Sequence, residues 1–322
     1  MPEETPEPAF RELFVSAADF VAEDIKRFEL RDPANAALPA FTAGSHIPLV
    51  TPTGALRRYS LCNDPREEDR YEIAVKRDAA GRGGSISICD TLNIGDRVDV
   101  AEPRSEFSLA PRAKRFLFIA GGIGITPILS MMRHLATTRA GTFKLVYLTR
   151  NAASTAFADV LAAPAFANVT TIHHDEGDPN NVFDLWPLLE RPTSAHVYCC
   201  GPRALMDSVR DMSGHWPFGA VHFESFGVDA ATRRNDTAFD VHLAQSGRVV
   251  HVPANQSILE ALRAENVLVR SSCEAGSCGS CRTTLVAGDV DHRDFVLSED
   301  ERATQIMVCC SRARSGTLTL GL

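Results

Sequence analysis

Five of the nine cysteines in this 322-residue chain fall between Cys273 and Cys310. Three of them form the run Cys273-Glu-Ala-Gly-Ser-Cys278-Gly-Ser-Cys281, and a fourth follows at position 309 or 310. The spacing C-x₄-C-x₂-C with a distant cysteine is typical of a plant-type [2Fe–2S] cluster, in which four thiolates hold two irons. Glycines 276 and 279 would let the loop turn its backbone N–H groups toward the sulfurs. The pattern therefore predicts an iron–sulfur centre.

Three other uses of these cysteines fit the pattern less well. A structural zinc site usually takes paired C-x₂-C knuckles, and only one such pair is present. Reduced thiols without a metal would leave the spacing unexplained, and a disulfide scaffold is typical of short secreted chains. Spacing alone does not choose between Cys309 and Cys310 as the fourth ligand; the other would be a small buried thiol.

A second group of residues suits a nucleotide. The glycine-rich turn Gly121-Gly-Ile-Gly124-Ile-Thr-Pro127 lies between an apolar strand and a helix, where backbone N–H groups can bind a pyrophosphate. It departs from the standard dinucleotide fingerprint because Pro127 replaces the third glycine, although proline suits the first turn of a helix. A second turn, Cys199-Cys-Gly-Pro202, follows another strand. Either could be only a tight turn, but together they predict a nucleotide site at the carboxyl ends of parallel strands.

A third group lies nearer the N-terminus. Arg57-Arg-Tyr59-Ser60 offers a cation, an aromatic ring and a hydroxyl on one strand. Gly81-Arg-Gly-Gly-Ser85 precedes an apolar helical pattern, so its amides could bind a phosphate. Taken alone, each could be an ordinary basic turn.

The elements that must position these groups differ along the chain. Up to about residue 107, short alternating stretches at 46–50, 59–61, 71–76 and 97–100 predict a small antiparallel barrel or sandwich. From residue 116 the pattern changes to buried strands at 116–120, 144–148, 169–173, 196–200 and 221–223, with helices between them, the first from about Pro127. This alternation is typical of a doubly wound parallel sheet.

The C-terminal part is a smaller α+β domain. Residues 229–236 are polar and aperiodic and are expected to form a linker. Stretches 240–243 and 248–252 predict a hairpin turning at Ser246-Gly247, and 316–320 predicts a closing strand. Ser257 and Glu260 fit the N-cap and N3 positions of a helix, a capping box.

Composition limits the function classes. A chain of this length suits two or three domains, and 44% hydrophobic with 23% charged residues is ordinary for globular proteins. The net charge of −8 argues against a nucleic-acid or anionic-membrane partner. No apolar run approaches the roughly 18 residues of a membrane span, and the acidic N-terminus does not fit a signal peptide. We expect a cytoplasmic protein that is a monomer.

The chain resembles the ferredoxin–NADP reductase superfamily because it contains, in this order, the motifs R-x-Y-S, G-G-x-G-x-T-P and C-G-P. The C-terminal ferredoxin motif narrows the resemblance to the phthalate dioxygenase reductase family. The likeness extends through 59–64, 74–78, 83–87, 222–227 and His292-Arg-Asp294, and covers essentially the whole chain. It implies an FMN-binding β-barrel domain over 1–110, an NAD-binding α/β domain over 111–228, the linker at 229–236 and a β-grasp ferredoxin domain over 237–322.

The resemblance also implies site residues. The flavin would be FMN rather than FAD. Its phosphate would be contacted by Arg57, Gly83, Gly84 and Ser85, its ring by Tyr59, and its polar edge by Ser60, Lys76 and Thr126. Phe226 would cover the face that the nicotinamide approaches. The nucleotide would lie on Gly122, Gly124, Gly201 and Pro202. Ser60, Cys200 and Glu224 would surround the point of hydride transfer. The family pattern favours Cys309 as the fourth cluster ligand, after Cys273, Cys278 and Cys281, and makes Cys310 a departure from the usual valine.

The family expectation is NADH rather than NADPH. Asp175 would place a carboxylate near the ribose and repel a 2′-phosphate, whereas Arg150 argues the other way because arginine can accommodate that phosphate.

The expected function is transfer of electrons from NADH through FMN and a [2Fe–2S] cluster to the terminal oxygenase of a Rieske-type aromatic dioxygenase or O-demethylase system. Two alternatives stay open at this point: a non-catalytic carrier or redox sensor, and a reductase that serves another acceptor such as a haem monooxygenase. The sequence does not indicate which substrate the oxygenase would take.

Overall fold

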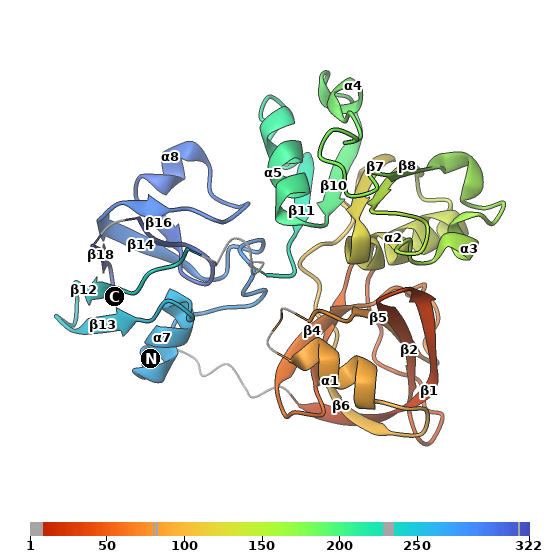
Figure 1. The fold of residues 1–322 in the computed structure, drawn as a ribbon, viewed down its shortest axis with the longest axis horizontal. Helices are drawn as coiled ribbons and strands as arrows, with labels where there is room; N and C mark the ends of the chain where they lie inside the picture. Colours follow the sequence, from red (N-terminus) through yellow and green to blue (C-terminus); the bar gives the residue numbers. More distant parts are fainter. Residues whose placement is uncertain (1–8, 80, 82, 228–234, 315) are drawn as a thin grey trace. The chain divides into compact units, whose positions relative to one another are not determined.

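The computed structural model describes residues 9–79, 81, 83–227, 235–314 and 316–322. The chain divides into two compact units, Met1–His222 and Phe223–Leu322 (Figure 1). Most of the expected linker at 229–236 lies outside the described residues. Among the described residues, no helix is long and apolar enough to cross a membrane.

The first unit begins with a six-stranded antiparallel barrel in the order β4-β3-β6-β1-β2-β5 (Figure 1). A bridge between Leu61 and Ile73 joins its two edge strands, β4 and β5, so the sheet closes. Alternate side chains fill the interior, among them Leu13, Phe28 and Ile47. The strands are β1 (Phe10–Ala22), β2 (Ile25–Arg31), β3 (His46–Val50), β4 (Leu56–Ser60), β5 (Tyr71–Lys76) and β6 (Arg97–Ala101), and α1 (Gly84–Thr91) contacts β5. The expected barrel is confirmed.

The sequence pattern does not predict the long hairpin of β1 and β2. Its register shifts between Val15 and Ala17 and again between Phe20 and Ala22. Each bulge adds a residue to one strand and reverses which side chains face the core, so the alternation that indicates a strand is interrupted.

The second part of this unit is a five-stranded sheet in the order β11-β10-β7-β8-β9. Its pairs β10–β7, β7–β8 and β8–β9 are parallel, as expected. The strands are β7 (Arg115–Gly121), β8 (Thr142–Thr149), β9 (Thr170–His174), β10 (His196–Cys200) and β11 (Val221–Glu224), which spans the boundary between the units. The helices are α2 (Ile125–Thr138), α3 (Ala158–Leu161), α4 (Trp186–Leu189) and α5 (Arg203–Met212).

Helix α2 begins two residues before the expected Pro127. A 3-10 turn, η1 (Gly122–Gly124), leads directly into it. The apolar face of α2 packs on the sheet through Ile128, Leu129 and Met132, so the glycine turn is held at the carboxyl end of β7.

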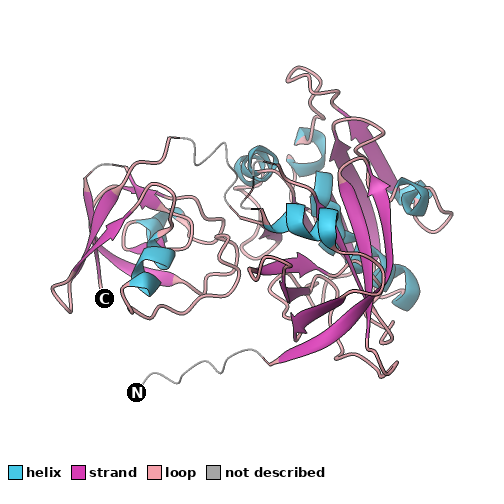
Figure 2. Cartoon of the chain, turned by 60° about the horizontal axis from the view of Figure 1, so that its bottom comes forward, coloured by secondary structure: helices cyan, strands magenta, loops and turns pink. Residues whose placement is uncertain are grey.

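The second unit holds a mixed sheet in the order β13-β12-β18-β14-β16 (Figure 1). Figure 2 shows its strands in magenta and its helices in cyan. Strand β12 runs parallel to β18, and the other pairs are antiparallel. Its elements are β12 (Phe239–Leu243), β13 (Val249–Val252), α7 (Ile258–Ala264), β14 (Arg282–Ala287), α8 (Glu299–Arg302), β16 (Gln305–Met307) and β18 (Thr317–Leu320), with a small ladder of β15 (Val290–Asp291) and β17 (Arg312–Ala313). Helix α7 packs against the sheet, and its capping box of Ser257 and Glu260 forms as expected. This arrangement is the expected ferredoxin-type α+β domain.

Candidate functional site

The four expected cluster ligands come together in the second unit as two pairs of thiols. The hydrogen bond between Cys273 and Cys278 lowers the pKa of Cys278 to about 5 and raises the pKa of Cys273. A second thiol hydrogen bond joins Cys281 and Cys309, which are 2% and 3% exposed, and raises the pKa of Cys281. Among the described residues, no group of three or more His, Cys, Asp or Glu side chains converges on one metal ion. Two thiol pairs instead match a cluster in which two cysteines serve each iron.

Backbone amides of the same loop point at these sulfurs. The Cys273 N–H donates to Cys278 Sγ (3.3 Å), and the Ala275 N–H donates to Cys273 Sγ (3.4 Å). The Gly276 amide contacts Cys309. Such donors stabilise the charge of cluster thiolates and tune its potential. Positive φ at Glu274, Gly276 and Gly279 produces this inward turn, so the loop fits a [2Fe–2S] cluster.

Cys310 lies beside the proposed ligand set. Its Sγ is directed to the Met307 C=O (3.7 Å) and hydrogen-bonds with the Cys309 thiol. A Cβ on Gly276 would come within 2.7 Å of this sulfur. Both adjacent thiols are therefore buried at the loop, and Cys309 as the fourth ligand stays a prediction.

The His292-Arg-Asp294 segment packs against this loop. The Phe295 N–H donates to the Gly276 C=O (2.9 Å), and Asp294, which is fully buried, accepts the N–H groups of Val296 and Leu297. Asp294 therefore shapes the turn that supports the cluster loop. In the sequence, only the resemblance to the family draws attention to Asp294.

In the barrel, the two expected phosphate-binding elements lie side by side. A Cβ on Gly84, the first residue of α1, would come within 3.1 Å of Arg57 Nε, so the guanidinium lies against this helix start. Gly83 is the N-cap in the left-handed conformation (φ 85°) and has no capping side chain, which leaves backbone amides available. Ser85 Oγ accepts the Asp78 N–H (3.1 Å) and ties the turn to the end of β5. This cradle fits a phosphate.

The residues expected at the flavin ring have different environments. Tyr59 is half-buried, and burial raises its pKa, so it stays neutral. Ser60 is buried, Lys76 is exposed at the end of β5, and the buried Thr126 donates its hydroxyl to the Ile123 C=O (3.0 Å) in the first turn of α2. Their flavin contacts stay predictions.

One buried residue beside this group was not predicted. His46 pairs with Ser60 across the β3–β4 ladder and is 5% exposed, and its Nε2 has no hydrogen-bond partner among the described residues. Burial, with the nearby Arg58 and Arg104, lowers its pKa to about 4, so the ring is neutral. Only the pairing of β3 with β4 across a short turn could have indicated that His46 lies opposite Ser60.

The two nucleotide turns pack backbone against backbone. A Cβ on Gly124 would lie 2.1 Å from the Cys200 O, and one on Gly201 would lie 2.9 Å from the Gly121 Cα. Glycine is therefore required at both places, and the turn after β7 is brought against the turn after β10. Gly122 and Pro202 lie in the same turns. Cys199 and Cys200 are both fully buried, and burial raises the pKa of Cys199.

The residues expected to read the ribose, Arg150 and Asp175, lie in turns that are joined by backbone hydrogen bonds. The Arg150 C=O accepts the Glu176 N–H (2.7 Å), and Asp175 Oδ1 accepts the Gly177 N–H (2.8 Å), at the ends of β8 and β9. Farther along the chain, Glu224 is buried at the end of β11 and Phe226 is half exposed. The roles of these residues stay predictions.

Three family models match successive parts of the chain. They are an oxidoreductase FAD-binding domain over residues 12–109, an oxidoreductase NAD-binding domain over residues 118–211 and a 2Fe-2S iron-sulfur cluster binding domain over residues 241–314. The match bears out a flavin, a nicotinamide nucleotide and a [2Fe–2S] cluster in one oxidoreductase.

Curated relatives match over nearly the full length. The chain is 54% identical to a phthalate 4,5-dioxygenase oxygenase reductase subunit of Pseudomonas putida over 97% of both chains. It is 38% identical to a vanillate O-demethylase oxidoreductase of a Pseudomonas strain over 97% of this chain and 99% of that one. A solved phthalate dioxygenase reductase, described as a modular structure for electron transfer from pyridine nucleotides to [2Fe-2S], has 54% identity and a TM-score of 0.77 and covers 98% of both chains. The chain belongs to the phthalate dioxygenase reductase family and is an iron–sulfur flavoprotein oxygenase reductase.

Proposed function

We propose that the chain takes a hydride from NADH onto FMN and passes single electrons through its [2Fe–2S] cluster to the terminal oxygenase of a Rieske-type aromatic dioxygenase or O-demethylase system. The observation that carries this proposal is the presence of two kinds of site in one chain. Paired glycine turns lie at the carboxyl ends of β7 and β10, and paired thiols lie in the second unit. The similarity to a phthalate 4,5-dioxygenase oxygenase reductase subunit and to a vanillate O-demethylase oxidoreductase supports this class of acceptor.

FMN is proposed from the phosphate cradle of the barrel. Arg57 and the start of α1 would bind the single phosphate, and Tyr59 would lie against the ring. Flavin supplies the conversion between two-electron and one-electron transfer, and the residues around it supply binding, orientation and electrostatics. Ser60 and Thr126 would hold the polar edge, and Phe226 would cover the ring until the nicotinamide arrives.

NADH is proposed as the donor from the turn at the end of β9. Asp175 is oriented by its hydrogen bond with the Gly177 N–H, so its carboxylate stays at the turn that would face the ribose. A fixed carboxylate there would repel a 2′-phosphate. Cys200 and Glu224 would flank the reacting carbon of the nicotinamide.

The cluster is proposed to be held by Cys273, Cys278, Cys281 and Cys309. Amide donors from the loop would stabilise the negative charge that enters with each electron. The domain limits at residues 110 and 228, the monomeric state and the cytoplasmic location stay predictions.

Cofactor analysis tests this proposal directly. Purified protein is expected to contain about two irons and one flavin per chain, and heat should release FMN. Since the matching family model is named for FAD, chromatography of the released flavin decides between the two. FAD or zinc would contradict the respective assignment.

Acceptor assays separate the competing functions. Turnover of cytochrome c with NADH would contradict a non-catalytic carrier, and NADPH should be a poor donor. Reconstitution with a purified Rieske-type oxygenase, in parallel with a haem monooxygenase, identifies the acceptor class. Product formation with the haem enzyme alone would contradict the proposed partner.

A further inference from the structure

Helix α2 carries a polar stripe that faces the barrel. Thr126, Ser130, Arg133 and Thr137 follow each other at intervals of four, three and four residues, which places them on one side of the helix. The rest of α2 packs on the sheet through apolar side chains. Thr126 and Ser130 are buried, Arg133 is partly buried and Thr137 is exposed, and the polar groups in the buried part of this stripe need specific partners.

Those partners are consecutive residues of one barrel loop. The Arg133 Nη1 donates to the Cys62 C=O (2.7 Å), and the Ser130 hydroxyl donates to the Asn63 C=O (2.8 Å). The Thr137 hydroxyl donates to Asp64 Oδ2 (2.6 Å). The helix thus contacts residues 62, 63 and 64 one by one, and its three polar side chains satisfy a loop that is itself buried.

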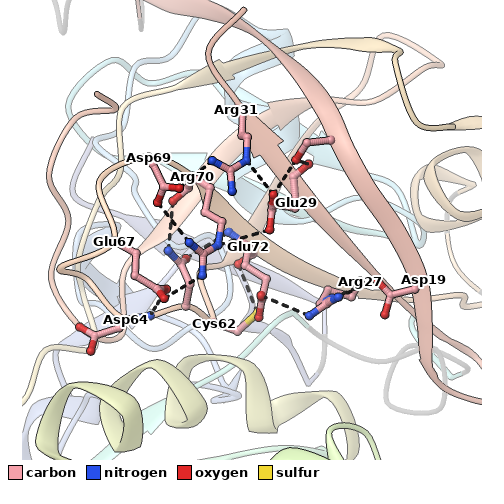
Figure 3. Close-up of polar contacts among 12 residues, drawn as sticks. Asp19, Arg27, Glu29, Arg31, Cys62, Asp64, Glu67, Asp69, Arg70 and Glu72 are labelled. Carbon is pink, nitrogen blue, oxygen red and sulfur yellow. Dashed lines mark hydrogen bonds and ion pairs between the residues drawn. The ribbon is translucent and has the colours of Figure 1, made fainter. Parts of the chain in front are cut away.

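An ion pair lies at the centre of this junction. Arg133 Nη1 is 2.8 Å from Glu72 Oε1, and the Glu72 side chain is 5% exposed. Figure 3 shows Glu72 beside Cys62 and Arg27: the Cys62 thiol donates to Glu72 Oε1 (3.3 Å), and Arg27 lies 3.5 Å from Glu72 Oε2. Burial alone would lower the pKa of Arg133, but Glu72 more than offsets this effect and the pKa is raised. Arg133 therefore keeps its charge, and Glu72 is contacted at both of its carboxylate oxygens.

The junction connects the segment that would contact the flavin with the segment that would bind the nicotinamide nucleotide. The loop of residues 62–64 is separated by Leu61 alone from Tyr59 and Ser60, which would contact the flavin. Helix α2 directly follows the Gly122–Gly124 turn, which would bind the nucleotide, and carries Thr126 in its first turn. Any shift of α2 against the loop would move hydride donor and acceptor relative to each other.

We propose that Arg133 and Glu72, together with Ser130 and Thr137, are positioning residues that set the distance between nicotinamide and flavin for hydride transfer. The inference rests on the proposed function. Reacting atoms must approach to about 3–3.5 Å, and a displacement of about 1 Å from a remote mutation can cost on the order of 10²-fold in rate. A junction of directed polar contacts fixes such a distance better than apolar packing, which tolerates small slips.

The test is anaerobic stopped-flow reduction of the flavin in the complete protein. For Arg133→Met we expect the rate of flavin bleaching at saturating NADH to fall by about 10- to 100-fold. The NADH dissociation constant should change little, because the glycine turns are intact, and the isotope effect with NADH deuterated at C4 should rise. The double variant Glu72→Gln with Arg133→Met removes the uncompensated charge and should be equally slow. Arg133→Lys should recover part of the rate, since it keeps the charge but loses the planar fork.

Arg31→Met is the matched control. Arg31 pairs with Glu29 and Asp69 on the same barrel (Figure 3), and its hydrogen bonds and ion pairs among the described residues do not reach α2. Its hydride-transfer rate should equal that of the wild type. Amide hydrogen exchange on the apoprotein gives a readout that is independent of flavin: residues 61–64 and 130–138 should exchange faster in Arg133→Met than in Arg31→Met.

Unchanged bleaching rate and isotope effect in the double variant would overturn the inference. If the Arg133 variants fail to fold, Ser130→Ala and Thr137→Val test the inference instead, since each removes one hydrogen bond of the junction. Wild-type rates of flavin bleaching in both of these variants would also overturn the inference. Absence of NADH-dependent bleaching in the wild type would contradict the proposed function instead.

Discussion

The cluster loop and the α2–barrel junction hold their reactive groups by opposite means. In the loop, three of the four proposed ligands, Cys273, Cys278 and Cys281, lie close together in the sequence, and three positive φ angles turn the amides inward. At the junction, Arg133 meets Cys62 and Glu72 from about 60 to 70 positions away, and side-chain contacts make the connection. The loop is shaped by its own backbone, whereas the junction exists only when two folded domains meet.

This difference predicts which property each region loses when a side chain is removed. A thiol removed from the loop leaves its fold nearly intact but removes the metal centre. A side chain removed from the junction leaves every cofactor ligand in place but loosens the alignment and the stability of the first unit. The predictions below separate these two kinds of damage, from the largest effect to the smallest.

The largest effect is expected at the fourth cluster ligand. Cys309→Ser should abolish the visible absorption of the cluster, since Cys309 pairs with Cys281 and receives the Gly276 amide. Cys310→Val should keep the spectrum, because valine has a similar size and Cys310 is assigned no iron. Absorption and EPR spectra of the two purified variants check this. The opposite pattern would make Cys310 the ligand.

At the junction, Arg133→Met should lower the free energy of unfolding by about 3–5 kcal/mol, because Glu72 is left buried with the longer Arg27 contact and the neutral Cys62 thiol as partners. The double variant Glu72→Gln with Arg133→Met should recover part of the loss. Urea unfolding of the apoproteins, arranged as a double-mutant cycle, measures the coupling. Additive effects of the two substitutions would show that the pair is not coupled.

The sequence reveals the loop more readily than the junction for the same physical reason. Cysteine spacing is a local pattern, and so is the glycine turn at Gly83-Gly84, whereas the pairing of this turn with Arg57 is indicated only by the family resemblance. Ser130 and Arg133 look like ordinary polar positions of an amphipathic helix, and nothing near Glu72 indicates its partner. These contacts depend on how the barrel meets the sheet, which no local pattern encodes. The same holds for His46, whose place opposite Ser60 follows only from strand pairing.

His46 gives the barrel a pH dependence. Its pKa falls from 6.5 to about 4 on folding, so the unfolded state binds more protons between these values. The stabilising contribution is therefore complete above about pH 6.5 and is lost as the pH falls toward 4, about 2 kcal/mol of it by pH 5. Urea unfolding at pH 7 and pH 5 should show a smaller loss for His46→Gln than for the wild type. An equal loss in both would mean that His46 is not the titrating group.

The smallest effect is expected at the cap of α7. Ser257 Oγ accepts the Glu260 N–H (3.1 Å), and Ser257→Ala should cost about 1 kcal/mol of stability in the second unit. Ser298→Ala is a matched control, since it removes the same capping box from the short, exposed α8. Thermal unfolding should show the larger shift for Ser257→Ala. A larger shift for Ser298→Ala would contradict the importance of α7 for the domain core.

The most direct test of the division between the two regions is the Cys278→Ala variant, assayed with two acceptors in parallel. Loss of the cluster should leave the first unit able to bind flavin and accept a hydride from NADH. Ferricyanide, which can take electrons from flavin, should still be reduced, whereas reduction of cytochrome c should fall to background. Full cytochrome c activity in this variant would contradict the order from NADH to flavin to cluster.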